Sequence, residues 1–112
     1  MFSFTKDKRL KTKKDFNDVF KQCDRIVTPE FTFLYRYNKV KLARLGLIIP
    51  KKQVNKAHDR NHIKRILRES FRIHDNLPCI DVIILARNKV DTRKQDQWKI
   101  KINKVWEKLL LL

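Results

Sequence analysis

The stretch RNHIKRILRESFR, residues 60–72, concentrates side chains that are suited to binding phosphate. If the stretch is helical, with 100° of turn per residue, its Arg and Lys side chains share one face with Asn61. The cations of that face are Arg60, Lys64, Arg65, Arg68 and Arg72. Guanidinium forks and ammonium groups pair with phosphate oxygens, so this spacing indicates a polyanion-binding face.

The mutual repulsion of these cations argues against a plain solvated helix face, which is the competing interpretation. Like charges at i, i+4 each cost a helix about a few tenths of a kcal/mol, and Glu69 points away from the repeat. Lys51, Lys52 and Lys56 precede the helix and add to the positive potential at its start. The whole chain carries a net charge of +16, which needs a polyanion to offset it.

Nucleic acid and anionic membrane are the candidate polyanions. A membrane-surface helix exposes a broad apolar face, whereas Ile63 and Leu67 are expected to dock this helix on a sheet. Helix-turn-helix DNA readers are mostly helical, but strand patterns flank this helix. Single-stranded RNA prefers cations mixed with aromatic rings, which Phe16 and Phe20 could supply, although rings at helical spacing also suit a core.

No set of residues indicates that the protein itself is a catalyst. His58 and His62 stand at i, i+4 but lack a third metal ligand at convincing spacing. Gly46 is the only glycine, which excludes a Gly-rich phosphate loop. A protein nuclease would gather several carboxylates around Mg²⁺, and no such cluster is present. We therefore expect no catalytic residue and no metal site in the protein.

The elements that position these residues follow from hydrophobic periodicity. The first helix is predicted from an apolar stripe at i, i+3, i+4 and i+7, and Thr12 and Asp15 have the spacing of a capping box. The stripe consists of Phe16, Val19, Phe20 and Cys23. Strands are predicted at 31–37, 42–49 and 79–86, the first with its four aromatic rings on a core face.

A last helix is predicted from about residue 94, with Trp98, Ile102, Val105 and Leu109 on its apolar face. The resulting order, α-β-β-α-β-α, predicts one α+β domain over residues 1–112. Two cysteines without a C-x-x-C spacing, no signal-peptide pattern and no apolar run of membrane-spanning length predict a cytoplasmic protein with reduced thiols.

Residues 51–72, KKQVNKAHDRNHIKRILRESFR, resemble the signature of the bacterial ribonuclease P protein component. That signature is a Lys-Lys pair, a short spacer and Ala-x-x-Arg-Asn-Arg-x-Lys-Arg-x-x-Arg-Glu. The matching residues are Lys51, Lys52, Ala57, Arg60, Asn61, Lys64, Arg65, Arg68 and Glu69. The similarity extends through RLKTKKDFNDVF, TPEFTFLYRYN, RLGLIIPKK and LPCIDVIILAR. Two positions depart from the family: His62 replaces its second Arg, and Pro50 replaces a small residue.

The resemblance implies an αβββαβα order with a mixed sheet, like the second domain of ribosomal protein S5. It places the additional strand near residues 50–54 and implies a left-handed crossover around the basic helix. It also implies that the catalytic RNA binds the face of Arg60, Asn61, Lys64, Arg65 and Arg68. The full set of expected RNA-binding residues adds Lys51, Lys52, Lys56 and His62. The cleft for the 5′ leader of precursor tRNA would contain Phe16, Phe20, Thr32 and Leu34.

By the same resemblance, the protein is a subunit of ribonuclease P that promotes 5′-end maturation of tRNA. The RNA subunit hydrolyses the phosphodiester, and Mg²⁺ is held by that RNA and the substrate. The expected partners are the catalytic RNA and precursor tRNA, with no membrane and no obligate protein partner. Two alternatives stay open: a structural, ribosomal-protein-like RNA binder without a role in cleavage, and a stand-alone metallonuclease.

Overall fold

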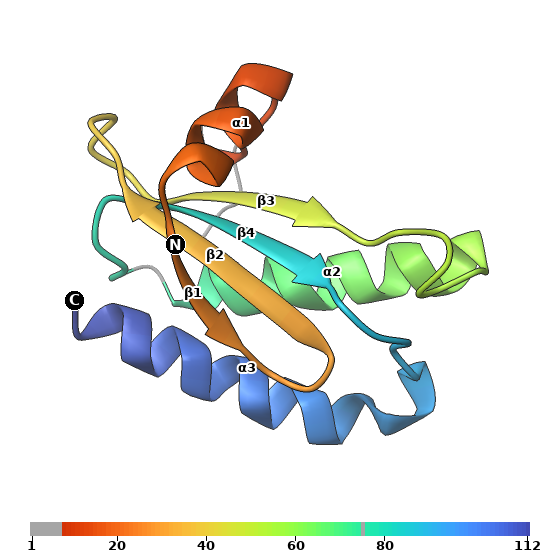
Figure 1. Ribbon diagram of the computed structural model, residues 1–112. Helices are drawn as coiled ribbons and strands as arrows, with labels where there is room; N and C mark the ends of the chain where they lie inside the picture. The colour runs from red at the N-terminus through yellow and green to blue at the C-terminus, as the bar shows by residue number, and fades with distance from the viewer. Residues whose placement is uncertain (1–7, 75) are drawn as a thin grey trace.

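A computed structural model of the chain describes residues 8–74 and 76–112 (Figure 1). The capping box predicted for the first helix is present: the hydroxyl of Thr12 accepts from the N–H of Asp15, and the Asp15 carboxylate accepts from the N–H of Thr12. The described elements, in chain order, are α1 (Lys13–Lys21), β1 (Asp24–Val27), β2 (Phe31–Tyr37), β3 (Arg44–Ile48), α2 (Ala57–Ile73), β4 (Ile80–Ala86), the 3-10 turn η2 (Thr92–Lys94) and α3 (Gln95–Leu110).

The four strands form one mixed sheet in the order β1-β2-β4-β3. β2 pairs antiparallel with both β1 and β4, whereas β3 and β4 are parallel and are connected through α2. Figure 1 shows α2 behind the sheet and the β3–α2–β4 connection as a left-handed crossover. The α+β class, the mixed sheet and the crossover are therefore as the sequence resemblance implies.

The larger part of the core lies between the sheet and the helices α2 and α3. Phe31 and Phe33 project from β2 into this layer, and each meets an indole of α3 edge-on. The ring centroids are 5.6 Å apart for Phe31 and Trp98 and 5.5 Å apart for Phe33 and Trp106. Burial of each such side chain contributes about 1.5–3 kcal/mol, so this layer provides most of the stability.

A smaller apolar cluster lies on the opposite face of the sheet, under α1 (Figure 1). Its buried members are Leu10, Val19, Leu34 and Ile83. α1 is short and covers only part of this face, so side chains on the rest of it stay partly exposed.

The additional strand is not where the resemblance placed it. Residues 51–54 form a turn, in which the N–H groups of Gln53 and Val54 donate to the carbonyl of Pro50. The strand is instead β1, in which Ile26 lies opposite Phe33 of β2. β1 has four residues at the sheet edge and three of them are exposed, so its sequence carries no alternating pattern that would reveal it.

The expectation that all four rings of β2 are core is wrong for Tyr37, which is 63% exposed where the strand enters the next turn. Both cysteines are free, as predicted, with Cys23 half-buried and Cys79 exposed.

Candidate nucleic-acid interface

The basic helix α2 docks through one face and exposes the other. Ile63, Leu67 and Phe71 are buried against the sheet and α3, while Asn61, Arg65 and Arg68 are exposed. Lys64 lies half-buried between these two faces. The amphipathic pattern of residues 60–72 therefore produces the separation of apolar and cationic faces that it predicts.

Arg9 extends this cationic face from a distant part of the sequence. The segment before α1 runs beside β3, where the N–H of Leu10 donates to the carbonyl of Leu45 at 2.9 Å. Arg9 thereby lines, with Arg65 and Arg68, a hollow of about 440 Å³ on α2. Partial burial, and then the charge of Arg9, lower the pKa of the Arg68 guanidinium. No local sequence signal predicts Arg9 as part of this face.

Arg60 is engaged within the protein. Its Nη1 donates to the carbonyls of Val54 and Asn55, each at 3.0 Å. These bonds connect the first turn of α2 to the loop that carries Lys52 and Lys56. Arg60 thus positions the neighbouring cations, whatever it contributes to binding directly.

The His62 side chain contacts α3, unlike the exposed cations of α2. Its Nε2 lies 2.8 Å from Oε1 of Gln95, at the start of α3, and the contact is partly buried. The side chain that replaces the family's usual Arg therefore links α2 to α3. Its assignment to the RNA-binding set stays a prediction.

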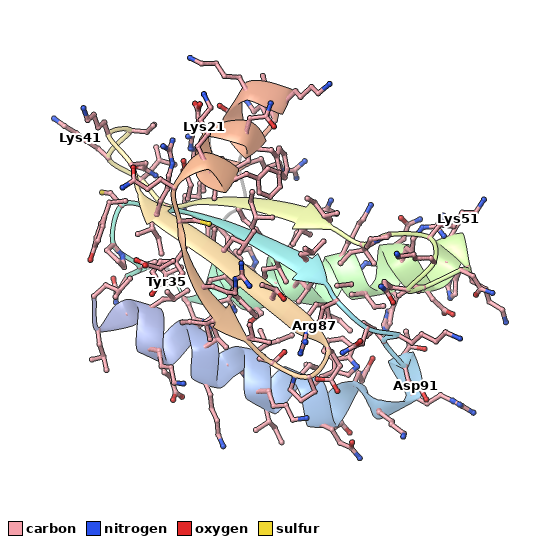
Figure 2. The ribbon with its side chains drawn as sticks, in the orientation of Figure 1. Lys21, Tyr35, Lys41, Lys51, Arg87 and Asp91 are labelled. Atoms are coloured by element: carbon pink, nitrogen blue, oxygen red, sulfur yellow. The ribbon has the colours of Figure 1, made fainter. Side chains whose placement is uncertain are left out.

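A second, larger hollow of about 710 Å³ lies between the loop before α2 and the loop after β4. Lys52 and Lys56 line one side, and Lys89 and Arg93 line the other. Figure 2 shows Lys51 and Asp91, one from each loop, at the same end of the molecule. The cations of the 89–93 loop were not predicted from the sequence, since they are scattered among polar loop residues.

Two aromatic side chains project from α1, Phe16 toward the sheet and Phe20 into a more exposed position. Phe16 lies directly over Gly46 of β3, where an added Cβ would meet Cε1 and Cζ of the ring at 2.7 Å. Phe20 is one turn further along and 45% exposed, and the two ring centroids are 6.5 Å apart. Their spacing brings both rings to the same side of the helix.

A row of side chains crosses all four strands of the sheet. The strand register places Val27, Thr32, Leu85 and Ile48 side by side. They share the α1 face of the sheet with Leu34 and Ile83, because alternate residues of a strand face the same way. Thr32, Leu85 and Ile48 are half-buried and Val27 is 47% exposed. The leader cleft that the resemblance implies would lie between this row and the two rings of α1, and we call this region the α1 cleft.

Leu34, predicted in this cleft with Thr32, is buried beneath α1, and its part in the cleft stays a prediction. It is 9% exposed and packs with Val19 and Ile83. Sequence reasoning missed Val27, Leu85 and Ile48, because their place in the row depends on the strand register.

A partly buried ionic cluster lies beside the first turn of α1. Arg44 donates to both oxygens of Asp81, at 2.8 and 2.9 Å, and Asn38 donates to the same carboxylate at 2.8 Å. The hydrogen bond with Asp81 is the main reason that the pKa of Arg44 is raised. Arg44 also lies 3.9 Å from the carboxylate of Asp15, so the cluster connects the sheet to the first turn of α1.

The described residues provide little for protein-based metal chemistry. Among residues 8–74 and 76–112, no three His, Cys, Asp or Glu side chains lie close enough together to hold a metal ion. In the same part of the chain, no helix is both long and apolar enough to cross a membrane.

Comparison with known proteins identifies the family. A family model described as Ribonuclease P matches residues 4–110. The chain belongs to the ribonuclease P protein family. A ribonuclease P protein component from Legionella pneumophila (strain Paris) is 53% identical over 109 residues, which cover 97% of this chain and 95% of that protein. The one from Pseudoalteromonas atlantica is 43% identical, covering 96% and 90% respectively.

Solved ribonuclease P proteins have the same fold. The Staphylococcus aureus protein superposes with a TM-score of 0.72 at 30% identity, covering 92% of each chain. The Thermotoga maritima protein gives a TM-score of 0.70 at 25% identity, covering 93% of this chain and 96% of that one. The family resemblance noted in residues 51–72 is therefore confirmed over nearly the whole chain.

Proposed function

We propose that this ribonuclease P family member is the protein subunit of a ribonucleoprotein endonuclease that matures the 5′ end of tRNA. It would bind the catalytic RNA through α2 and the 5′ leader of precursor tRNA in the α1 cleft. The observation that carries this proposal is the coexistence of two different surfaces: a cationic face on α2, and a partly exposed pair of aromatic rings on α1, on the opposite side of the sheet.

The cationic face suits an RNA backbone. Arg9, Arg65 and Arg68 line one hollow together with the Arg72–Glu69 ion pair, and the excess of positive charge gives the hollow a positive potential. Binding there would displace counterions from the RNA, so affinity would fall steeply as salt rises. The loop cations at Lys52, Lys56 and Lys89 would continue this potential toward the substrate.

The α1 cleft suits an unpaired strand. Bases have apolar faces that stack on rings such as Phe16 and Phe20 irrespective of sequence, and the row through Thr32 provides an apolar floor. A duplex hides its bases in the stack and would gain little from such a cleft. A leader extending from the tRNA would therefore be distinguished from mature tRNA, which lacks it.

The chemistry belongs to the RNA subunit in this proposal, with Mg²⁺ held by that RNA and the substrate and not by a dedicated protein site. The protein would contribute by reducing phosphate repulsion and by fixing the path of the leader, which is positioning and not proton transfer. It would act in the cytoplasm, with the catalytic RNA and precursor tRNA as partners and no obligate protein partner.

Reconstitution tests the function directly. The protein, a bacterial ribonuclease P RNA and a labelled precursor tRNA are combined at low Mg²⁺, and cleavage at the mature 5′ end is measured with and without protein. Stimulated cleavage is expected. Binding to the RNA without stimulation would instead indicate a structural RNA-binding protein, and cleavage by the protein and Mg²⁺ alone would indicate a metallonuclease.

The cleft is tested by Phe16→Ala combined with Phe20→Ala. Because each stacked base contributes about 1–3 kcal/mol, precursor binding should weaken while mature tRNA binding changes little. Phe20→Ala alone provides a folded variant if the double one is unstable, since Phe20 is 45% exposed. Ile100→Ala, a change at an apolar residue of α3 that is 58% exposed, is the control. Equal losses for both substrates would refute a leader cleft.

A further inference from the structure

A third hollow lies at the C-terminal end of α2, and Arg72 is its only described lining residue that belongs to the cationic face predicted from the sequence. Its volume is about 230 Å³, and it lies between the end of α2, the turn from β2 to β3 and the segment before β4. Leu42, Phe71 and Leu77 supply apolar surface, and Lys8, Lys41 and Arg72 supply positive charge. We call it the Lys41 hollow. None of the described residues that line it is acidic.

The Lys41 hollow continues the cationic face of α2. Arg72 lines both this hollow and the one that contains Arg65 and Arg68. Arg9 lines the α2 hollow, and its neighbour Lys8 lines the Lys41 hollow. A polynucleotide bound at the α2 hollow would therefore reach the Lys41 hollow at Arg72, which lines both.

The turn that presents Lys41 is held in a fixed shape. The Asn38 side chain donates to the carbonyl of Leu42 at 3.0 Å and accepts from the N–H of Val40 at 3.1 Å. The same side chain donates to the buried Asp81, which connects the turn to the sheet. Figure 2 shows Lys41 at the tip of this turn, on the outside of the molecule.

Lys41 also has an unfavourable backbone conformation. Its φ is 67°, in the left-handed region, which costs a residue with a Cβ about 1–2 kcal/mol. No other non-glycine residue among those described has a positive φ. Strained positions of this kind tend to occur where a side chain has a role in binding.

We propose that the Lys41 hollow holds one unpaired nucleotide of the RNA that binds α2. The base would lie against the apolar floor, and the adjoining phosphates would contact the cationic rim. This assignment rests on the proposed function, since it takes the RNA subunit as the ligand of α2. Arg72 already pairs with Glu69 on its own helix, so Lys8 and Lys41 are expected to make the phosphate contacts.

The size and chemistry of the hollow favour a single nucleotide. Its volume is below the range of about 300–1,000 Å³ that is usual for drug-sized ligands. Protein sites for unpaired RNA combine cations for the backbone with apolar or aromatic surface for a splayed base, which is the combination found here. A duplex would contact the rim only and leave Leu42 and Leu77 uncovered.

A matched pair of charge-neutralising variants tests the proposal. Lys41→Gln and Lys39→Gln each remove one charge from the same turn, but only Lys41 lines the hollow. With a bacterial ribonuclease P RNA transcript as the probe, Lys41→Gln should lower affinity about tenfold and reduce the salt slope by about one. Lys39→Gln should have a much smaller effect. Equal effects of the two variants would show general electrostatic attraction and overturn the proposal.

Lys41→Gly separates binding from folding. Glycine adopts positive φ without strain, so the variant should unfold at the same or a higher temperature than the wild type. Its RNA affinity should nevertheless fall as far as that of Lys41→Gln. Wild-type affinity in Lys41→Gly would overturn the proposal, whatever its effect on stability.

Cys79 provides an independent measurement, because it is exposed and lines the Lys41 hollow. In the saturated complex with the RNA transcript, most of its alkylation by iodoacetamide should be lost, and Lys41→Gln should restore it. The half-buried Cys23, the only other cysteine, serves as the reference. Undiminished labelling of Cys79 would refute the site. Failure of the wild-type protein to stimulate cleavage would instead refute the proposed function.

Discussion

Gly46 shows how one residue without a side chain shapes the α1 cleft. The ring of Phe16 lies against its Cα, and this contact allows α1 to approach the sheet closely at β3. An added Cβ would also lie 3.1 Å from Cδ1 of Leu10, so there is little space for it to move away from the ring. The only glycine of the chain is therefore placed where a methyl group would displace a cleft residue.

Gly46→Ala should both destabilise the fold and alter the cleft. An added Cβ 2.7 Å from two ring carbons must push Phe16 outward, and overpacking of this kind costs about 1–3 kcal/mol. Denaturant unfolding should show this loss, and precursor tRNA binding should weaken more than mature tRNA binding. Phe16→Leu added to Gly46→Ala should restore part of the stability, so strictly additive losses would contradict the contact.

At the scale of the element, the cap of α1 connects helix formation to cleft geometry. Asp15 accepts hydrogen bonds from the N–H groups of Lys11 and Thr12, both at 3.2 Å, and faces Arg44 of the sheet. Partial burial alone would raise the pKa of Asp15, but the backbone hydrogen bonds and the charge of Arg44 outweigh it and lower the pKa. The ionised form of Asp15 therefore stabilises the folded state.

Asp15→Asn should change the pH dependence of stability. Because the folded-state pKa lies below the ordinary value of 3.8, the contribution of Asp15 is complete above that pH and is lost as pH falls through the folded value. Neutralising Asp15 should lower the free energy of unfolding by about 1 kcal/mol at pH 7, a typical value for a cap. Stability should then fall less steeply as the pH is lowered. Thermal unfolding from pH 2 to pH 7 measures this, with Asp96→Asn of α3 as the control. If the stability of Asp15→Asn fell as steeply with decreasing pH as that of the wild type, the role assigned to Asp15 would be contradicted.

At the scale of the whole molecule, charge determines how the protein meets its partner. The net charge of +16 attracts any polyanion, so affinity alone cannot show where the RNA lies. The salt dependence is more informative, because each phosphate contact that is removed lowers the slope of log affinity against log salt by about 0.7–0.9. Arg65 and Arg68 suit such a test better than Arg60, whose side chain holds the loop before α2.

Arg65→Gln combined with Arg68→Gln should lower that slope by about 1.5 for a ribonuclease P RNA transcript. Lys104→Gln combined with Lys108→Gln removes the same charge from exposed positions of α3 and is the control. Filter binding at several salt concentrations measures both slopes. The same reduction in both variants would mean that α2 is not a distinct binding face.

Local patterns in the sequence determined a large part of this architecture. Periodicity and capping residues located α1, α2, α3 and the three longer strands, because these signals depend on neighbours within a few residues. The cationic face of α2 and the pairing of Phe16 with Phe20 follow from helical spacing for the same reason. Family resemblance supplied the strand count and the crossover, which no local pattern contains.

Only the tertiary structure decided which distant residues meet. Register across the sheet aligned Val27, Thr32, Leu85 and Ile48, and the pairing of the N-terminal segment with β3 brought Arg9 to α2. Packing of α2 on α3 turned His62 toward Gln95. Such contacts join residues far apart in the chain, and their geometry depends on how all the elements pack together. That packing is a property of the whole fold, which is why the sequence alone predicted the cationic helix but not the hollows around it.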